Sequence, residues 1–510
     1  MGKDHTSIID KRQEELNERL DRRWQPETES PVFGSLGGNV DHEVAERTRA
    51  FNHGGLGLVQ QLVKLIGLPE EIDSNLDLLK RHVPYHESDH ILNIVYCMLS
   101  GGQNLEDIKV RRWDLSYLEA LGARRIPDAT TAGDFLRRFD PEDIHVFMES
   151  LNSLRQKIWL KQPEEKREVA IIDVDGTLLD FTGECKEGAD FSYKGTWGYG
   201  PLVVSLANTG EVLYIVNRAA NRPSHDGASE WMEKAAAWAK SAGFKRVRFR
   251  GDTDLSLTEH FDRWDEQGIQ FVFGIDAHPS FVKWADAIAE SDWTPLERAN
   301  SAVRTEPRSR PYNFREAAVV AREYENQRLQ AEHVAEIDYR PTKSKQTYRM
   351  IILRKNISIE KGEILLLDKI RYFFYVTNVS ASEMTSEQVI FDNNARCNQE
   401  NLICQMKSGV RAFNAPAVEF NANWAYMVIG ALAWNLKAWL GLVLPESLYP
   451  GFDPSELLRM EFRTFVRKII DVPAQILRSG RRLVFRLLAC PQMVRLIADG
   501  GRWFRQQRAY

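Results

Sequence analysis

The chain has 510 residues, more than one ordinary domain, and 43% hydrophobic, 27% charged and 10% aromatic residues, as in soluble globular proteins with a large core. Its net charge of −5 indicates no particular partner, and five scattered cysteines without a CxxC pair suggest neither a zinc site nor a disulfide framework. Residues 1–20 hold no apolar segment of the kind a signal peptide needs, so we expect a reducing, cytoplasmic setting.

The N-terminal third divides into a polar tail and a helical domain. Residues 1–53 are rich in both charges and then in Pro, Gly and Ser, which predicts a mobile tail or a helix feeding a linker. Residues 54–166 carry apolar residues at three- and four-residue spacing, which predicts a helical domain that serves DNA binding or dimerisation. Within it, Pro127 to Phe139 predicts a capped helix with a basic end. This helix could enter a DNA groove or could pack only on its neighbours, and both interpretations stay open.

A short apolar run opens the central part of the chain. Residues 169–172 (VAII) predict a buried strand that ends in Asp173, Asp175 and Gly176. Because side chains alternate along a strand, the two carboxylates share one face. Ionised carboxylates at a buried strand end are costly unless something compensates, and a divalent cation is the usual compensation. The alternative is a strand end with an ordinary Asp-Gly turn.

The pattern of residues 167–280 as a whole predicts a mixed α/β sheet with carboxylates at strand ends. Paired strands are joined at 208–210 (NTG), and a helix at 229–242 ends at Gly243. A strand at 245–250 runs into Asp252 and Asp254, and a helix at 261–267 precedes a strand at 269–276.

The pattern changes between residues 281 and 390. A charged helical piece at 315–329 precedes strands at 347–355, 362–370 and 371–379, which predicts a β-rich insertion domain rather than a continuation of the α/β core. Trp293, in this region, could stack on a flipped base, but in a chain with 13 Trp a core role is the better interpretation.

Helical pattern returns in residues 391–450. The stretch 424–444 is about as long as a membrane span, but Asn435 and Lys437 within it favour a buried core helix. Residues 451–510 form a basic C-terminal region, with Arg478, Arg481, Arg482 and Arg486 among its charges. We expect a basic tail that faces phosphates or is simply a solvated surface.

A polar helical stretch at 393–407 adds a third acidic residue. Arg396 and Glu400 are four residues apart and lie on one helix face, and Lys407 lies two turns further on nearly the same face. One stripe then offers a carboxylate flanked by two cations. The alternative is a surface helix with a common ion pair.

Two families share these aspartates. The segment 173–178 (DVDGTL) resembles the first motif of haloacid dehalogenase-like phosphatases, in which Asp173 would be the nucleophile, and Asp252 and Asp254 imitate their acidic metal motif. That family also needs a run of βα units and a lysine between the motifs, whereas hairpin-like strands follow the first motif here.

The second resemblance covers most of the chain, from Gly54 to Leu487. Arg396, Glu400 and Lys407 match the spacing of the Tyr-Arg-Glu-Lys signature of insertion-sequence DDE transposases, and Asn393 stands where the Tyr would be. Asp175 in Asp-Gly-Thr and Asp252 after a later strand resemble that family's first two catalytic aspartates. The segments 193–210, 249–256 and 395–440 look like the group called thirteen-eighty among bacterial insertion sequences.

The resemblance implies a fold and a site. The fold would be α/β, with an RNase H-like catalytic core (167–280 and 391–450) interrupted by the mainly β insertion domain (281–390) and flanked by the helical domain and the basic tail. Two Mg²⁺ or Mn²⁺ ions would be held by Asp175, Asp252 and Glu400. Asp173 and Asp254 would either support these ligands without touching the metal or bind the metal in place of Asp175 and Asp252. Phosphate and DNA contacts would come from Arg396, Lys407, Asn393, Gln399 and Asn401.

The resemblance also implies a reaction and its partners. Water would attack the transposon end to free a 3′-hydroxyl, which would then attack target DNA at the same site. The partners would be double-stranded DNA, as terminal inverted repeats and target, and a second copy of the chain in the DNA complex, with no membrane. The setting would be the bacterial cytoplasm, at the nucleoid. A DNA-binding relic that has lost catalysis remains an alternative.

Overall fold

The computed structural model describes residues 6–21, 42–43, 48–80, 82, 84–297, 328–360, 363–479, 482–489 and 493–507. Contacts divide the chain into two compact units. The first, which we call the helical unit, holds residues 1–162, 181–189 and 402–510, and the second, the sheet unit, holds residues 163–180 and 190–401. The expected boundary at residue 391 is not where the contacts divide, because residues 402–450 cluster with the N-terminal helices.

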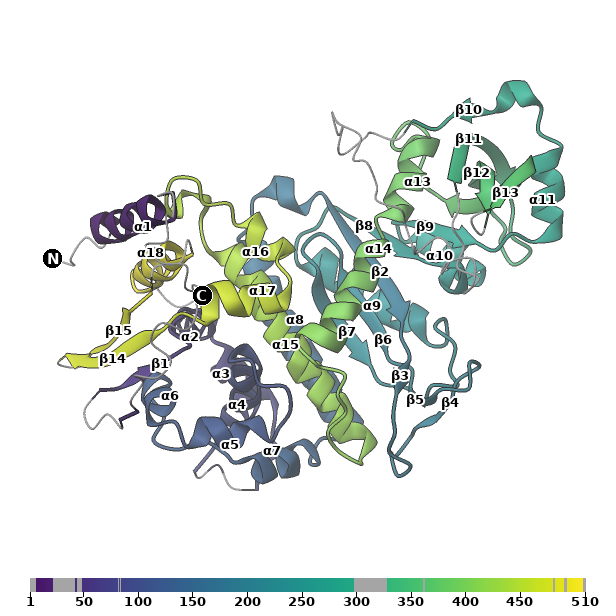
Figure 1. Ribbon diagram of the computed structural model, residues 1–510. Coiled ribbons are helices and arrows are strands. Elements are labelled where there is room, and N and C mark those ends of the chain that lie inside the picture. Colours follow the sequence, from purple (N-terminus) through teal and green to yellow (C-terminus); the bar gives the residue numbers. More distant parts are fainter. Residues whose placement is uncertain are drawn as a thin grey trace. The chain divides into compact units, whose positions relative to one another are not determined.

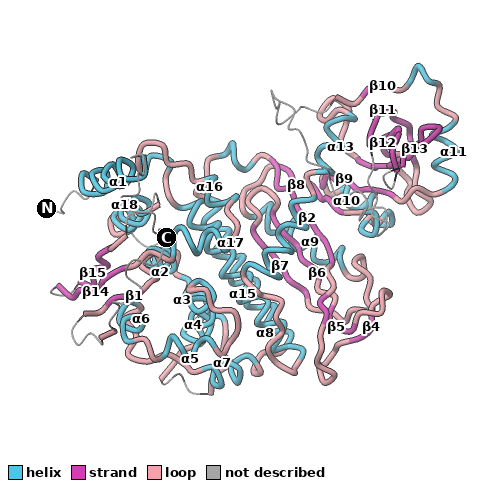
Figure 2. Tube along the Cα trace, in the orientation of Figure 1, coloured by secondary structure: helices cyan, strands magenta, loops and turns pink. Residues whose placement is uncertain are grey.

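The helical unit confirms the helical pattern predicted for residues 54–166, and helices dominate this stretch in Figure 2. Local caps fix several helix starts; Asp140, for example, accepts a hydrogen bond from Asp143 N–H at 2.9 Å, directly before Pro141. Its helices are α1 (Thr6–Asp21), α2 (Leu56–Leu65), α3 (Leu68–Asn75), α4 (Glu87–Leu99), α5 (Asp107–Arg112), α6 (Leu115–Ala120), α7 (Ala129–Leu136), α8 (Pro141–Leu160), α15 (Phe420–Val443), α16 (Ser455–Arg459), α17 (Phe462–Phe465) and α18 (Val494–Phe504).

Helix α15 is the core of the helical unit. It packs against α4, α7, α8 and α16, and 94% of its most apolar 18-residue window is buried although its length and composition would suit a membrane span. Lys437, in its middle, is fully buried, and its ammonium donates to the carbonyls of Leu457, Leu458 and Met460 at 2.8–3.0 Å. Because the ammonium has these three acceptors, a lysine can lie inside the core. The stretch 424–444 is therefore a buried core helix, as its sequence predicted.

The C-terminal region, which we expected as a basic tail, forms strands and helices in its described part. Strands β14 (Ala474–Ser479) and β15 (Arg482–Leu487) form an antiparallel hairpin, and β1 (Ala50–Phe51) pairs with β14. Helix α18 packs on α2. Residues from both ends of the chain therefore build one unit, which charge composition alone could not reveal.

A nine-stranded mixed sheet forms the sheet unit, in the order β10-β11-β12-β13-β9-β8-β2-β6-β7 (Figure 1). Strands β2, β8 and β9 run parallel, and all other neighbours are antiparallel. The strands are β2 (Val169–Gly176), β6 (Leu202–Leu206), β7 (Glu211–Val216), β8 (Arg246–Gly251), β9 (Ile269–Ile275), β10 (Thr294–Pro295), β11 (Arg328–Tyr339), β12 (Tyr348–Glu360) and β13 (Glu363–Thr377).

Helices connect and cover these strands. Helix α9 packs on β2, β6, β7 and β8, and α13 packs on β9, β11, β12 and β13. A small separate sheet follows β2 in the chain, in the order β3-β5-β4. These remaining elements are β3 (Leu179–Asp180), β4 (Asp190–Phe191), β5 (Trp197–Tyr199), α9 (Ala228–Ser241), α10 (Phe261–Glu266), α11 (Pro279–Asp286), α13 (Ser386–Asn394) and α14 (Cys397–Cys404), the last of which crosses the division between the units.

The predicted mixed α/β sheet is confirmed, and the insertion needs a correction. Strands β11 to β13 continue the same sheet, because Phe374 to Thr377 of β13 pair with Ile275 to Val272 of β9. The two strands predicted at 362–370 and 371–379 are one strand, β13. Trp293 is 7% exposed and packs in the core beside Arg354 and Tyr372, so its predicted core role is confirmed. The helical piece predicted at 315–329 lies almost entirely outside the described residues.

Candidate active site

Two aspartates lie at the ends of neighbouring parallel strands. The register of β2 and β8 sets Asp173 beside Arg250. Asp175 is two residues further along β2, and Asp252 directly follows β8. Because both strands run in the same direction, their carboxyl ends meet at one edge of the sheet, where ligand sites of α/β sheets commonly form. Asp175 and Asp252, both predicted as metal ligands, therefore lie at the same edge of the sheet.

Arg396 joins the third carboxylate to the first. Its Nη1 lies 3.6 Å from Asp175 Oδ2, and its Nη2 lies 3.8 Å from Glu400 Oε1. The side chains of Asp175 and Arg396 are 15% and 17% exposed, whereas Glu400 is 63% exposed. Arg396 lies in the turn before α14 and Glu400 in the first turn of that helix, so the two do not share a helix face as expected, but their ion pair brings Glu400 toward Asp175.

The two aspartates, Asp175 and Asp252, have raised pKa values. Burial, together with the negative charge of Asp252 and Glu400, raises the pKa of Asp175 to about 7, against the opposing effect of Arg396. Burial also raises the pKa of Asp252, and Asp254 adds to this rise while Arg396 opposes it. Arg396 therefore does not fully offset the cost of ionising these two aspartates, and a divalent cation would offset it.

The donor set fits hard divalent ions in its chemistry, since all three candidate ligands are carboxylates. Their oxygens do not all lie within 4.8 Å of one another in the described part of the chain. Binding of one ion by all three would require side-chain movement, and Glu400 is the most exposed of the three. Its exposure leaves room for that movement.

Asp173 is not placed as a ligand or as a nucleophile. It is 1% exposed, and its two oxygens accept hydrogen bonds from Arg250 Nε at 2.7 Å and Arg250 Nη2 at 2.8 Å. Arg250 Nη1 also donates to the backbone carbonyl of Asp392, on α13, at 2.8 Å. We call these three residues the arginine network. It argues against the phosphatase interpretation, which needs Asp173 free to attack a substrate.

Asp254 is occupied by other partners. Its Oδ2 accepts the backbone N–H of Ser224 at 3.0 Å, and its Oδ1 lies 2.8 Å from Nδ1 of His225. Asp252 Oδ1 instead accepts the N–H of Asp254 at 3.1 Å, which begins a short 3₁₀ turn. Asp252 keeps more of its carboxylate available than Asp254 does, which favours it as the ligand.

Two of the residues expected to touch DNA face the sheet instead. Gln399 is 2% exposed, its Nε2 donates to the carbonyl of Val203 at 3.0 Å, and its Oε1 accepts from Ser205. Its amide is therefore used inside the protein, which corrects its predicted role. Asn393 is partly buried and directs Nδ2 toward the carbonyls of Gly251 and Val272 at 3.4–3.5 Å.

Asn401 and Lys407 are exposed. Lys407 belongs to the helical unit, in a π-helical turn (Gln405–Gly409) that follows α14. Because a π-helix turns less per residue than an α-helix, the expected alignment of Lys407 with Glu400 does not follow from their spacing.

Sequence reasoning missed Arg250 and Asp392. A signal was present, because Arg246, Arg248 and Arg250 alternate along a strand that was predicted to enter the core. Arginines on one face of a central strand need acidic partners, and Arg248 Nη1 indeed lies 3.5 Å from Asp392 Oδ1. The partners could not be named, since Asp392 is more than a hundred residues away.

Comparisons with known proteins show which family the chain belongs to. A search of curated proteins found no match. Among solved structures, the chain is similar to a cryo-EM structure of the piggyBac transposase synaptic complex with hairpin DNA, with 12% identity, 83% of this chain and 84% of that chain covered, and a TM-score of 0.36. A family model described as "Transposase DDE domain group 1" matches residues 48–499. With this match across most of its length, the chain belongs to the group 1 family of DDE transposases, enzymes of DNA transposition.

Proposed function

We propose that the protein cleaves DNA at the ends of an insertion sequence and joins them to target DNA, with Asp175, Asp252 and Glu400 as its catalytic carboxylates. The observation that carries this proposal is the placement of Asp175 and Asp252 at adjacent parallel strand ends with Arg396 between Asp175 and Glu400. The three antiparallel strands β2, β6 and β7, followed by the parallel β8 and β9, support an RNase H-like core.

Enzymes of the DDE class use divalent metal ions, and Asp175, Asp252 and Glu400 would hold them here. When bound, two Mg²⁺ or Mn²⁺ ions would activate the attacking oxygen and stabilise the leaving oxygen. The raised pKa of Asp175 means that this residue releases a proton when a cation binds near neutral pH. Arg396 has a planar guanidinium that suits a phosphate oxygen, and it would turn from Glu400 to the scissile strand.

Contacts to the rest of the DNA would come from exposed basic and polar side chains outside the carboxylate site. Arg478, Arg482 and Arg486 are exposed on the β14–β15 hairpin, and Asn401 and Lys407 are exposed near the end of α14. Contacts to phosphates fix the position of the duplex, and base contacts add specificity. We further propose the bacterial group thirteen-eighty as the subgroup, terminal inverted repeats as the ends, a dimer on DNA, and the nucleoid as the place of action.

The test is metal-dependent nicking of DNA that carries the element's own ends. Wild type should nick it with Mg²⁺ or Mn²⁺, and Glu400→Gln should abolish nicking while DNA binding survives. Asp254→Asn is the matched control and should keep most activity, because Asn can still accept a hydrogen bond from Ser224. Undiminished cleavage by Glu400→Gln would remove this residue from the site. DNA binding by wild type without any cleavage would identify a catalytically dead relic.

A further inference from the structure

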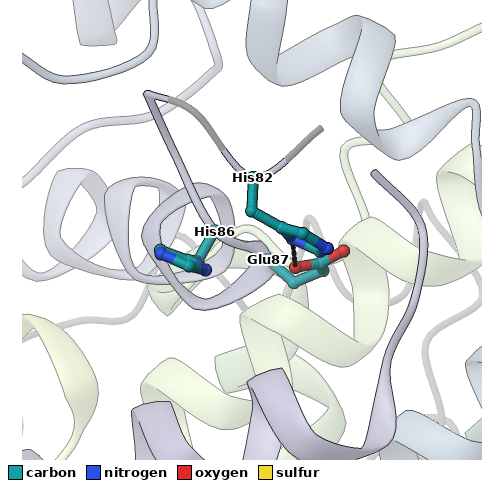
Figure 3. A group of neighbouring side chains, drawn as sticks. All are labelled: His82, His86 and Glu87. Carbon is teal, nitrogen blue, oxygen red and sulfur yellow. Dashed lines mark hydrogen bonds and ion pairs between the residues drawn. The ribbon is translucent and has the colours of Figure 1, made fainter. Parts of the chain in front are cut away.

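A second group of metal-ligand side chains lies in the helical unit, at the start of α4. His82, His86 and Glu87 each offer one ligand atom, and these atoms all lie within 4.8 Å of one another (Figure 3). In the described part of the chain, no other group of three or more His, Cys, Asp or Glu residues has its ligand atoms this close together. All three residues come from a six-residue stretch, so one loop and one helix start are enough to build the group.

Glu87 is prepared to act as a ligand. Its side chain is 1% exposed, and Oε1 accepts the backbone N–H groups of Leu78 and Leu79, both at 3.0 Å. These two bonds hold the carboxylate in place and leave Oε2 facing Nδ1 of His82 at 3.2 Å. Metal-binding carboxylates are commonly held by such hydrogen bonds from the surrounding protein.

The two histidines complete the group from the solvent side. Their ring centroids are 5.6 Å apart and their planes differ by 17°. The backbone N–H of His86 donates to Asp89 Oδ2 at 2.9 Å, which fixes where α4 begins and therefore where His86 stands. His82 is 46% exposed and His86 is exposed. An ion could thus enter from solvent and keep a water molecule as a further ligand.

We propose that His82, His86 and Glu87 bind Zn²⁺. Two imidazoles and one carboxylate are a ligand set that zinc accepts, with water in the fourth position, whereas Mg²⁺ and Ca²⁺ prefer oxygen ligands alone. Zn–N bonds of about 2.0 Å require the ligand atoms to draw closer together. The exposed His82 and His86 side chains can rotate to do so while Glu87 stays fixed. The ion would tie the loop between α3 and α4 to the first turn of α4, away from the residues assigned to catalysis.

Calorimetric titration of the tag-free, full-length chain with Zn²⁺ tests the proposal. The background is Asp175→Asn, Glu400→Gln, so that zinc taken up by the catalytic carboxylates does not count. One Zn²⁺ per chain should bind, and the melting temperature should rise with zinc. Glu87→Gln keeps an oxygen for Leu78 and Leu79 but loses the ligand, and it should weaken binding by more than about 100-fold. His86→Gln, at an exposed position that does not threaten folding, should do the same.

The matched control is His42→Gln, an exposed histidine of the same unit outside this group. It should bind zinc as the background chain does. Visible absorption of Co²⁺ in place of Zn²⁺ should show tetrahedral coordination that disappears in Glu87→Gln. Two results would overturn the proposal: no zinc uptake by the background chain, or equal uptake by His86→Gln. In either case the group would be only an ion pair between His82 and Glu87.

Discussion

Arg250 donates two hydrogen bonds to the carboxylate of Asp173, and the two residues are direct neighbours in the register of β8 and β2. The same guanidinium donates to the carbonyl of Asp392, in the helix that precedes Arg396 and Glu400. The arginine network therefore ties together the three elements that carry or lead to the candidate catalytic residues. These hydrogen bonds fix the positions of the three elements, and they leave Asp175, Asp252 and Glu400 available to bind metal.

Replacing Arg250 with Met should lower the free energy of unfolding by about 3–5 kcal/mol, because Asp173 would be left buried without its counter-charge. Chemical denaturation measures this change. Arg246→Met is the control, since Arg246 stands on the same strand but is exposed and pairs with Glu383 at the surface, so its effect should stay below about 1 kcal/mol. Equal effects of the two substitutions would show that the arginine network does not stabilise the sheet unit.

Asp175 should make metal binding depend on pH. Because its pKa is raised to about 7, a cation must displace a proton below that pH, and affinity for Mn²⁺ should fall by up to about tenfold for each pH unit below it. Calorimetric titrations at pH 6, 7 and 8 measure this. The Asp175→Asn variant should bind Mn²⁺ weakly at every pH. A wild-type affinity that is unchanged between pH 6 and 8 would contradict the assignment.

The same residue should reduce stability in the absence of metal. The unfolded chain releases the Asp175 proton near its usual pKa of 3.8, whereas the folded chain keeps it to about 7. Between these values the folded state binds more protons, so its stability falls as pH rises, and the full cost is present above pH 7. Asp175→Asn should therefore stabilise the metal-free protein at pH 8, by roughly 1–3 kcal/mol, and much less at pH 4. Thermal unfolding at the two pH values would reveal no difference if the residue were solvated.

Replacing Gln399, which is buried, and Asn401, which is exposed, should have different effects on stability. Gln399→Ala should cost about 1–3 kcal/mol, because the carbonyl of Val203 and the hydroxyl of Ser205 lose their buried partner. Asn401→Ala should change stability by less than about 0.5 kcal/mol, since Asn401 is exposed. Denaturation curves and DNA-binding measurements on both variants check this. A stable Gln399→Ala variant with lost DNA affinity would restore the original DNA-binding prediction.

The exposed arginines of the β14–β15 hairpin should contribute to salt-dependent DNA binding. If Arg478 and Arg482 each contact a phosphate, replacing both with Gln should reduce the slope of log K against log salt by about 1.8. Binding titrations at several salt concentrations measure the slope. Arg459→Gln, which removes an exposed arginine that pairs with Asp453, is the control and should leave it unchanged. A double variant with the wild-type slope would place the DNA elsewhere.

Local patterns were enough to predict most elements of the core. Apolar periodicity gave α9, β8, β9 and α15 within a few residues, and the four-residue spacing of Arg396 and Glu400 indicated that their side chains lie close together. These predictions depend only on residues close together in the chain. Asp175 and Asp252 could be chosen because each sits where an apolar run ends.

Non-local pairing accounts for what the sequence could not reveal. No local feature indicates that β13 pairs with β9, about a hundred residues earlier, so the insertion was expected to be a separate domain. The burial of Gln399 depends on which face of its helix meets β6, and α-helical periodicity in a polar stretch does not decide that. The group at His82, His86 and Glu87 contains no cysteine, so the absence of a CxxC pair did not bear on it and the sequence did not single it out.

The continuous ladder between β9 and β13 also bears on how the protein can move. Separate domains commonly reorient about a flexible linker, but here Phe374 to Thr377 are paired by backbone to the strand next to β8, which leads to Asp252. Independent rotation of the inserted strands would break these pairs. The inserted strands are therefore expected to move together with β9 and β8, and so with the strand end that leads to Asp252.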